Sequence, residues 1–169
     1  MSGLEEKAVR GILDGHHNDP QQIIAALLDI QEASGTSHVD RRWAAMTARA
    51  LHVPESRVHE VLTFYSMLSE EPRGRHVAEV CQSAPCLYSG GRELMGWLKD
   101  ALGVEEGGTT ADGAVTLEVS GCCGRCSGSP ALMVGEEAYT VASPEDARIL
   151  AESFRENSPE KRRSLQCEK

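Results

Sequence analysis

The cysteines are the residues of this 169-residue chain best suited to chemistry, and five of the six fall in two short groups. The first group is Cys81-Gln-Ser-Ala-Pro-Cys86, and the second, 35 residues later, is Cys122-Cys123-Gly-Arg-Cys126. Each group comes after a short apolar run and is followed by glycine-rich sequence, so the two loops can meet at one end of a sheet. Thiolates that converge from two such loops suit an inorganic iron–sulfur cluster.

Two other kinds of site compete for the same thiols. Cys123-Gly-Arg-Cys126 alone is a Cys-x-x-Cys dithiol of the type used by thiol–disulfide oxidoreductases. In those enzymes the pair lies at a helix N-terminus, whose partial positive charge lowers the pKa of the nucleophile, whereas Ser-Gly-Ser-Pro follows here. Four thiolates would also bind zinc in an interaction module, although structural zinc sites generally use tighter two-residue spacings.

The surplus thiols have ordinary structural explanations. We expect Cys123 to fill an apolar slot as a small hydrophobic side chain, and Cys167, in a charged tail, to have no role. The histidines show no ligand spacing with the cysteines, so we expect no histidine ligand. Four serine hydroxyls flank the thiols as expected hydrogen-bond donors to sulfur: Ser83, Ser120, Ser127 and Ser129.

Charge and composition limit the possible partners. The net charge of −9, with no basic stripe, excludes nucleic acid as an expected partner and favours a partner with a basic docking surface. No signal-peptide core is present at the N-terminus, and the longest aliphatic run, residues 23–28, is too short to span a bilayer. We therefore expect a cytoplasmic protein without membrane insertion, on its own or in a complex at the cytoplasmic face of a membrane. In that compartment cysteines are more often metal ligands or catalytic than disulfide-bonded.

Apolar spacing predicts three helices before the first cysteine. The first covers residues 20–33 with Asp19 as its N-cap, the second covers 40–52, and the third begins at Pro54 and continues to about residue 68. We expect Phe64 and Tyr65 to belong to the core of this helical part.

The second half of the chain alternates between strands and helices. The predicted order is a strand at 76–80, a helix from 90 to 102, a strand at 114–119, a hairpin at 131–141 and a helix at 143–154. The fold class is therefore α+β or α/β, a three-helix bundle followed by a small sheet with helices on its faces. We expect the helical bundle, for partner docking, at 1–71, the cysteine-bearing domain at 72–155 and a charged, flexible tail at 156–169.

The cysteine spacing and several other segments resemble the thioredoxin-like [2Fe–2S] subunit family of respiratory complex I, NAD-dependent formate dehydrogenases and NAD(P)-linked hydrogenases. The cysteine pattern is Cys-x4-Cys, about 35 residues, then Cys-x3-Cys. The resemblance covers roughly residues 20–150 and implies a thioredoxin-like fold with a cis bond before Pro130. The other segments that carry it are residues 27–32, 61–66, 72–74, 109–113 and 129–130.

The resemblance implies that Cys81, Cys86, Cys122 and Cys126 ligate one [2Fe–2S] cluster, with Cys123 where the family usually has an apolar residue. Only the spacing to Cys126 separates Cys122 from Cys123 as the third ligand. The implied role is one-electron exchange with the flavin of an FMN- and NADH-binding subunit, in a complex with further iron–sulfur subunits and with no catalytic acid, base or nucleophile on this chain. No G-x-G-x-x-G or P-loop occurs, so FMN and NAD(H) are expected on the partner.

Overall fold

The structure is a computed structural model that describes residues 4–166. The chain divides into two compact units, with the division between Arg73 and Gly74, two residues beyond the boundary expected from the sequence. Each unit has its own hydrophobic core. Cys167 lies outside the described residues. In the part of the chain that is described, no helix combines the length and the apolar character needed to cross a membrane.

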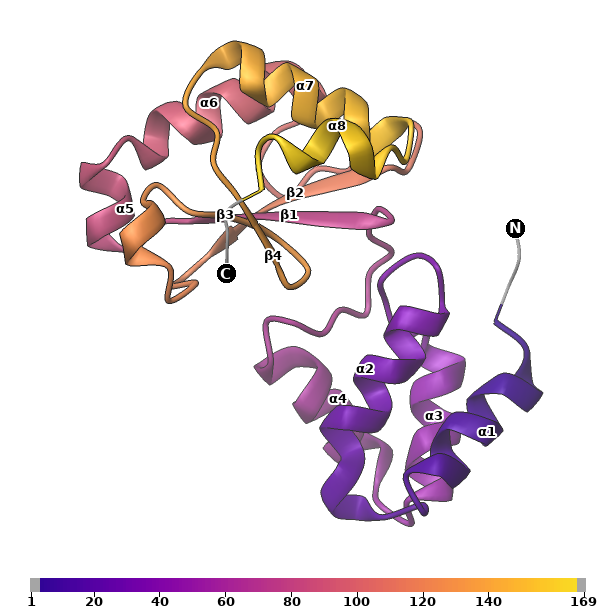
Figure 1. The fold of residues 1–169 in the computed structure, drawn as a ribbon. Coiled ribbons are helices and arrows are strands. Elements are labelled where there is room, and N and C mark those ends of the chain that lie inside the picture. The colour runs from indigo at the N-terminus through magenta and orange to yellow at the C-terminus, as the bar shows by residue number, and fades with distance from the viewer. Residues whose placement is uncertain (1–3, 167–169) are drawn as a thin grey trace. The chain divides into compact units, whose positions relative to one another are not determined.

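The first unit is helical and contains the three expected helices together with one earlier helix that we did not predict (Figure 1). Asp19 acts as an N-cap as predicted, since its carboxylate accepts the N–H of Gln21 at 2.9 Å. Asp40, which we expected as the first residue of its helix, is also an N-cap and accepts the N–H of Arg42 at 2.7 Å. The elements are α1 (Glu6–Gly15), the 3₁₀ turn η1 (Pro20–Gln22), α2 (Ile23–Ala33), α3 (Arg41–Ala50) and α4 (Glu55–Phe64).

The core of the helical unit is aliphatic, but the expected burial of Phe64 is wrong. Leu27, Ile30 and Leu51 are fully buried, whereas the side chain of Phe64 is 78% exposed. Helix α4 ends at Phe64, and the backbone of Tyr65 is already extended, so the Phe64 ring leaves the inner face of the helix. Its only ring neighbour among the described residues is Tyr65, edge-on at 5.1 Å between centroids.

The second unit is built on a four-stranded mixed sheet with the order β2-β1-β3-β4. Strand β1 pairs in parallel with β2 and antiparallel with β3, and the hairpin of β3 and β4 completes the sheet. Helices α6 and α7 pack side by side on one face of the sheet (Figure 1). The elements are β1 (His76–Cys81), α5 (Ala84–Tyr88), α6 (Gly91–Leu102), β2 (Val115–Ser120), η2 (Cys126–Gly128), β3 (Leu132–Val134), β4 (Glu137–Tyr139) and α7 (Pro144–Arg155).

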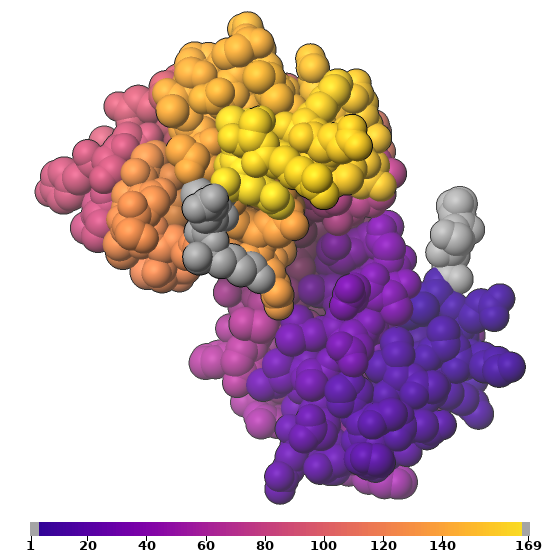
Figure 2. Space-filling model, viewed as in Figure 1, coloured from indigo at the N-terminus to yellow at the C-terminus, as the bar shows by residue number. Residues whose placement is uncertain are grey.

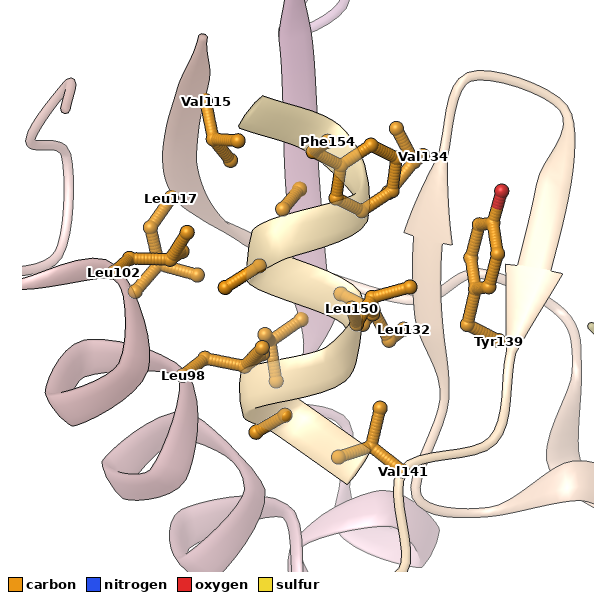
Figure 3. Close-up of a cluster of buried hydrophobic side chains, with 14 of the residues drawn as sticks. Leu98, Leu102, Val115, Leu117, Leu132, Val134, Tyr139, Val141, Leu150 and Phe154 are labelled. Atoms are coloured by element: carbon orange, nitrogen blue, oxygen red, sulfur yellow. The ribbon is translucent and has the colours of Figure 1, made fainter. Parts of the chain in front are cut away.

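Aliphatic side chains and two aromatic rings hold this sheet and its helices together. In Figure 3, Leu98 of α6 and Leu150 of α7 belong to the same buried cluster as Leu117 of β2. Phe154 fills the end of the cluster, with its ring 5.8 Å from that of Tyr139. Ser143 caps α7 as predicted, since its hydroxyl accepts the N–H of Asp146 at 3.2 Å.

The tail differs from the flexible segment that we expected, because residues 159–163 form helix α8 (Pro159–Arg163). This helix lies directly on α7, where it is coloured yellow in Figure 2. The guanidinium of Arg162 stacks over the Phe154 ring at 4.7 Å, and the N–H of Thr140 donates to the carbonyl of Leu165 at 2.8 Å. A charged, aperiodic sequence is thus ordered by contacts with the sheet domain, which its own pattern does not reveal.

Candidate metal centre

The first cysteine group begins where β1 ends. Cys81 is the last residue of β1, and Cys86 lies in the short helix α5 that follows. Both thiols are almost completely buried, at 1% exposure each, and together with Ala131 they form a small cluster of their own. The N–H of Cys81 donates to the carbonyl of Ala131 at 3.0 Å, which joins this loop to the start of the hairpin.

The Cys81 sulfur is surrounded by groups that stabilise a thiolate. Burial tends to raise the pKa of this thiol, but the hydroxyl and N–H of Ser83, the N–H of Cys123 and the thiol of Cys86 together lower it to about 6. The Ser83 hydroxyl lies 3.3 Å from the sulfur. The expected role of Ser83 as a donor to sulfur therefore agrees with the geometry.

Gly91 fixes the distance between the first cysteine group and helix α6. A Cβ on Gly91 would lie 2.9 Å from the carbonyl oxygen of Cys86 and 3.5 Å from that of Cys81. Only glycine allows the helix to begin this close to the loop. Of the two glycines that follow the first cysteine group, Gly91 is therefore needed for packing.

The second cysteine group follows β2, the parallel neighbour of β1. Cys81 pairs in register with Ser120, and the N–H of Gln82 donates to the carbonyl of Ser120 at 3.0 Å. Parallel neighbours end at the same edge of a sheet, so α5 and the loop of residues 121–130 lie at the same end of the domain (Figure 1). The loops therefore meet as the sequence predicts.

Within this second loop, the three cysteines have different surroundings. Cys122 and Cys126 are exposed, whereas Cys123 is partly buried against Cys81 and Cys86. Burial raises the pKa of Cys123, and the Ser120 hydroxyl acts in the opposite direction. These surroundings agree with the expectation that Cys123 is a small hydrophobic side chain in an apolar slot. The cysteine that packs against Cys81 is therefore Cys123, whereas the spacing selects Cys122 as the ligand.

Two further serines were expected to serve the second loop. The Cys86 thiol donates to the Ser129 hydroxyl at 3.9 Å, and that hydroxyl donates to the carbonyl of Cys126 at 2.7 Å, so the expected role of Ser129 as a donor to sulfur is wrong. Ser127 is exposed and makes no hydrogen bond to sulfur in the described part of the chain. The peptide bond before Pro130 is cis, as the resemblance implied.

The surroundings of Cys126 give no support to a thioredoxin-type dithiol. Cys126 opens a single three-residue 3₁₀ turn, η2, and not an α-helix. The aligned peptide dipoles that lower a thiol pKa in such enzymes are therefore missing beside this pair.

The donor set fits an iron–sulfur cluster, although the site is only half assembled. Soft thiolates from two loops at one sheet edge are the ligands that such a cluster uses. Between residues 4 and 166, however, no three Cys, His, Asp or Glu side chains are gathered closely enough to hold a metal ion. Among the described residues, Cys122 and Cys126 are exposed and are not gathered with the buried pair of Cys81 and Cys86.

The domain is a small mixed sheet with helices on one face and a cysteine loop after each of two parallel strands. This arrangement places the chain in the class of thioredoxin-like domains. The model of the thioredoxin-like [2Fe–2S] ferredoxin family matches residues 9–155, so the chain belongs to this family. The match includes all five cysteines of the two groups and most of the helical unit.

Curated relatives extend over most of the chain. It is 34% identical over 140 residues to the E subunit of the NADH-quinone oxidoreductase of Pseudomonas aeruginosa, covering 82% of this chain and 83% of the relative. It is 32% identical over 156 residues to the corresponding E subunit of Escherichia coli K12, covering 92% of each. These relatives are subunits of an oxidoreductase.

The fold also occurs within a larger solved protein. The crystal structure of an air-oxidised NAD⁺-reducing [NiFe]-hydrogenase matches 82% of this chain with a TM-score of 0.69 and 19% sequence identity. Our chain corresponds to 24% of that hydrogenase chain. At this identity the match shows that the fold is shared.

Proposed function

We propose that this protein is an electron-transfer subunit that carries one [2Fe–2S] cluster and exchanges single electrons with a flavin on a partner subunit. The observation that carries the proposal is the buried pair of Cys81 and Cys86, which faces a glycine-rich loop with Cys122 and Cys126 at the same sheet edge. Membership of the [2Fe–2S] ferredoxin family supports the choice of cluster.

The proposed ligands are Cys81, Cys86, Cys122 and Cys126. The first two are held by β1 and α5, and the second two arrive on the loop after β2. Cys123 packs beneath them against Cys81 and is not a ligand. This assignment keeps the Cys-x4-Cys and Cys-x3-Cys spacings and gives each of the five thiols a single role.

The chain's contribution to the chemistry is binding, shielding and hydrogen bonding. The cluster supplies the one-electron redox step, and no residue here has to act as acid, base or nucleophile. Ser83 places its hydroxyl 3.3 Å from the Cys81 sulfur, where a hydrogen bond stabilises negative charge. Ala131 and Cys123 cover the inner side and exclude water from it.

The proposed partner is an FMN- and NADH-binding subunit of a multisubunit NAD(P)H-linked oxidoreductase, of the complex I, formate dehydrogenase or hydrogenase type. The names of the relatives support this, since they are subunits of NADH-quinone oxidoreductases. FMN, NAD(H) and further iron–sulfur centres belong to other subunits of that complex. We place the assembly in the cytoplasm or at the cytoplasmic face of a membrane, with no part of this chain inserted in the bilayer.

The helical unit offers an apolar surface for docking to that partner. Phe64 and Met67 are 78% and 51% exposed, and they are two of the three large hydrophobic side chains exposed among the described residues. The side-chain amide of Gln31 holds the backbone of Met67 and Ser69 in place. Its nitrogen donates to the Met67 carbonyl at 2.8 Å, and its oxygen accepts the Ser69 N–H at 2.9 Å. A fixed, exposed apolar segment of this kind is typical of an interaction site.

A double variant tests the docking surface. Phe64→Ser with Met67→Ser should weaken copurification with the flavoprotein subunit while leaving the cluster spectrum unchanged. Ser56→Ala, at an exposed position on the same helix, is the matched control. Unchanged copurification of the double variant would remove this surface from the proposal.

The proposed cluster is tested on the full chain after anaerobic purification. We expect about two iron and two sulfide per chain, and an S = 1/2 EPR signal after reduction with dithionite. A colourless protein with bound zinc, or a metal-free protein with an oxidisable Cys123–Cys126 pair, would overturn the proposal in favour of an interaction module or a thiol oxidoreductase.

A further inference from the structure

The two cysteine loops have a charge that differs from that of the chain as a whole. The chain has a net charge of −9, but residues 82–92 and 120–130, which contain four of the five thiols, have no aspartate or glutamate. Their only charged side chains are Arg92 and Arg125. Within these two segments the charge is therefore positive, while the carboxylates of Glu79, Glu93 and Glu118 stand within three residues of them.

Arg125 is the arginine built into the site itself. It stands directly before the ligand Cys126 and forms the N-cap position of η2, where its carbonyl accepts the N–H of Gly128 at 3.0 Å. Consecutive Cα atoms are about 3.8 Å apart, so the Arg125 backbone stays next to the proposed ligand Cys126 wherever the loop lies. Gly124, with a φ of +68°, makes the turn that precedes it.

The Arg125 side chain is partly buried and its charge is not neutralised locally. Its guanidinium makes no ion pair or hydrogen bond with any residue that the structure describes. Several other arginines are paired, such as Arg57 with Glu60 at 2.8 Å and Arg10 with Glu6 at 2.7 Å. Along the chain, this cation is next to the proposed ligand Cys126 and three residues from Cys122.

We propose that Arg125 raises the reduction potential of the cluster by stabilising its reduced state. This inference rests on the proposed function, because it requires the cluster to be bound. A cluster held by four thiolates is an anion, and reduction adds one more negative charge. A fixed positive charge beside it therefore stabilises the reduced form more than the oxidised form, and partial burial limits the screening by water.

The test is a redox titration of the full chain followed by EPR. Arg125→Gln should shift the ratio of reduced to oxidised cluster about tenfold towards the oxidised form at a fixed applied potential, which corresponds to about 59 mV for a one-electron couple. Arg125→Lys, which keeps the charge, should stay close to wild type. Arg92→Gln, at an exposed position in the first turn of α6, is the control for general surface charge and should shift the ratio much less.

The outcomes separate this inference from the proposed function. An Arg125→Gln potential equal to that of wild type, or an Arg125→Lys shift as large as that of Arg125→Gln, would overturn the role of the charge while leaving the cluster in place. A wild-type chain without a cluster would overturn both proposals. If Arg125→Gln does not assemble a cluster, Arg125→Ala provides a second neutral side chain. If neither neutral variant binds a cluster while Arg125→Lys does, Arg125 is needed for cluster assembly, and its proposed effect on the reduction potential is overturned.

Discussion

The two cysteine loops are at the same edge of one sheet, but the protein holds them in different ways. In the first loop, Cys81 and Cys86 are fixed by a strand and a helix and are buried. In the second loop, Cys122 and Cys126 are exposed on a segment with little regular structure. One half of the proposed site is thus preformed, and the other half has to close over the cluster.

Under the proposed function, this difference would divide the site into two parts with different tasks. A site with four fixed, buried thiols would have to open before a cluster could enter. The proposal instead has the fixed pair receive the cluster, with the loop that has glycines at positions 121, 124 and 128 following. The binding energy of the last two proposed ligands would then order the loop.

The largest expected effect is the loss of bound iron when a proposed ligand is removed, and it can be compared with the effect of the same change on unfolding free energy. Cys86→Ala and Cys126→Ala should each reduce the bound iron to a small fraction of the wild-type amount, because each removes one of the four proposed ligands. In the metal-free protein, Cys86→Ala should cost about 1 kcal/mol of unfolding free energy, since it removes a buried side chain, and Cys126→Ala should stay within about 0.5 kcal/mol of wild type. Iron analysis and urea unfolding measure the two effects. Equal destabilisation by both changes would contradict a preformed first half.

One glycine from each cysteine loop tests whether the first loop is more rigid than the second. Gly91→Ala should destabilise the sheet domain by about 1–3 kcal/mol, because its Cβ would lie 2.9 Å from the Cys86 carbonyl oxygen. Gly121→Ala in the second loop is the matched control, since its Cβ would meet nothing within 4 Å. Thermal unfolding of the metal-free chains compares them. Equal midpoints for the two variants would show that the first loop is as adaptable as the second.

The far end of β1 gives a prediction about pH. Burial lowers the pKa of His76 below its ordinary value of 6.5, and the positive charges of Arg162 and Arg75 add to this effect. The unfolded state therefore binds a proton more readily than the folded state, so the stability of the sheet domain is complete above about pH 6.5 and falls as the pH falls below it. His76→Gln should flatten this dependence between pH 7 and 5 in urea unfolding of the metal-free protein. An unchanged slope would assign the dependence to other groups.

The smallest expected effect concerns the hydroxyls near sulfur. Ser83→Ala removes the hydroxyl 3.3 Å from the Cys81 sulfur, so the pKa of Cys81 in the metal-free protein should rise from about 6 towards its ordinary value. Titration of the Cys81 ¹³Cβ chemical shift by NMR measures this change. Ser127→Ala, whose hydroxyl contacts no sulfur in the described structure, should leave the Cys81 titration in place. A rise of similar size in both variants would argue against a specific hydrogen bond.

Much of the site scaffold could be predicted from local sequence signals. The strands that end at the two cysteine groups, and the caps Asp19 and Ser143, follow from patterns that reach only a few residues. Such patterns determine local backbone structure. They were therefore sufficient to predict that the two loops meet.

Features that depend on tertiary contacts could not be predicted in this way. Helix α1 is different, because its local signal was present and we missed it: Val9, Ile12 and Leu13 recur at helical spacing and pack in the core of the helical unit. Helix α8 has a charged sequence and is ordered by the stacking of Arg162 on Phe154. The exposure of Phe64 depends on where α4 ends, and helix boundaries are the least certain part of any prediction from sequence.

The choice between Cys122 and Cys123 is the point at which spacing and geometry differ. Spacing selects Cys122 as the ligand, whereas the structure places Cys123 beside Cys81. We combine the two observations by proposing that Cys123 packs against Cys81 inside the domain and that Cys122 is the cluster ligand.

The most direct test of the proposed site is therefore to compare Cys122→Ser with Cys123→Ser after anaerobic purification of the full chain. We predict that Cys122→Ser loses most of the reduced EPR signal and of the bound iron and sulfide, and that Cys123→Ser keeps them. The reverse result, in which Cys123→Ser loses the cluster and Cys122→Ser retains it, would show that the thiol already in contact with Cys81 is the ligand and would contradict our assignment.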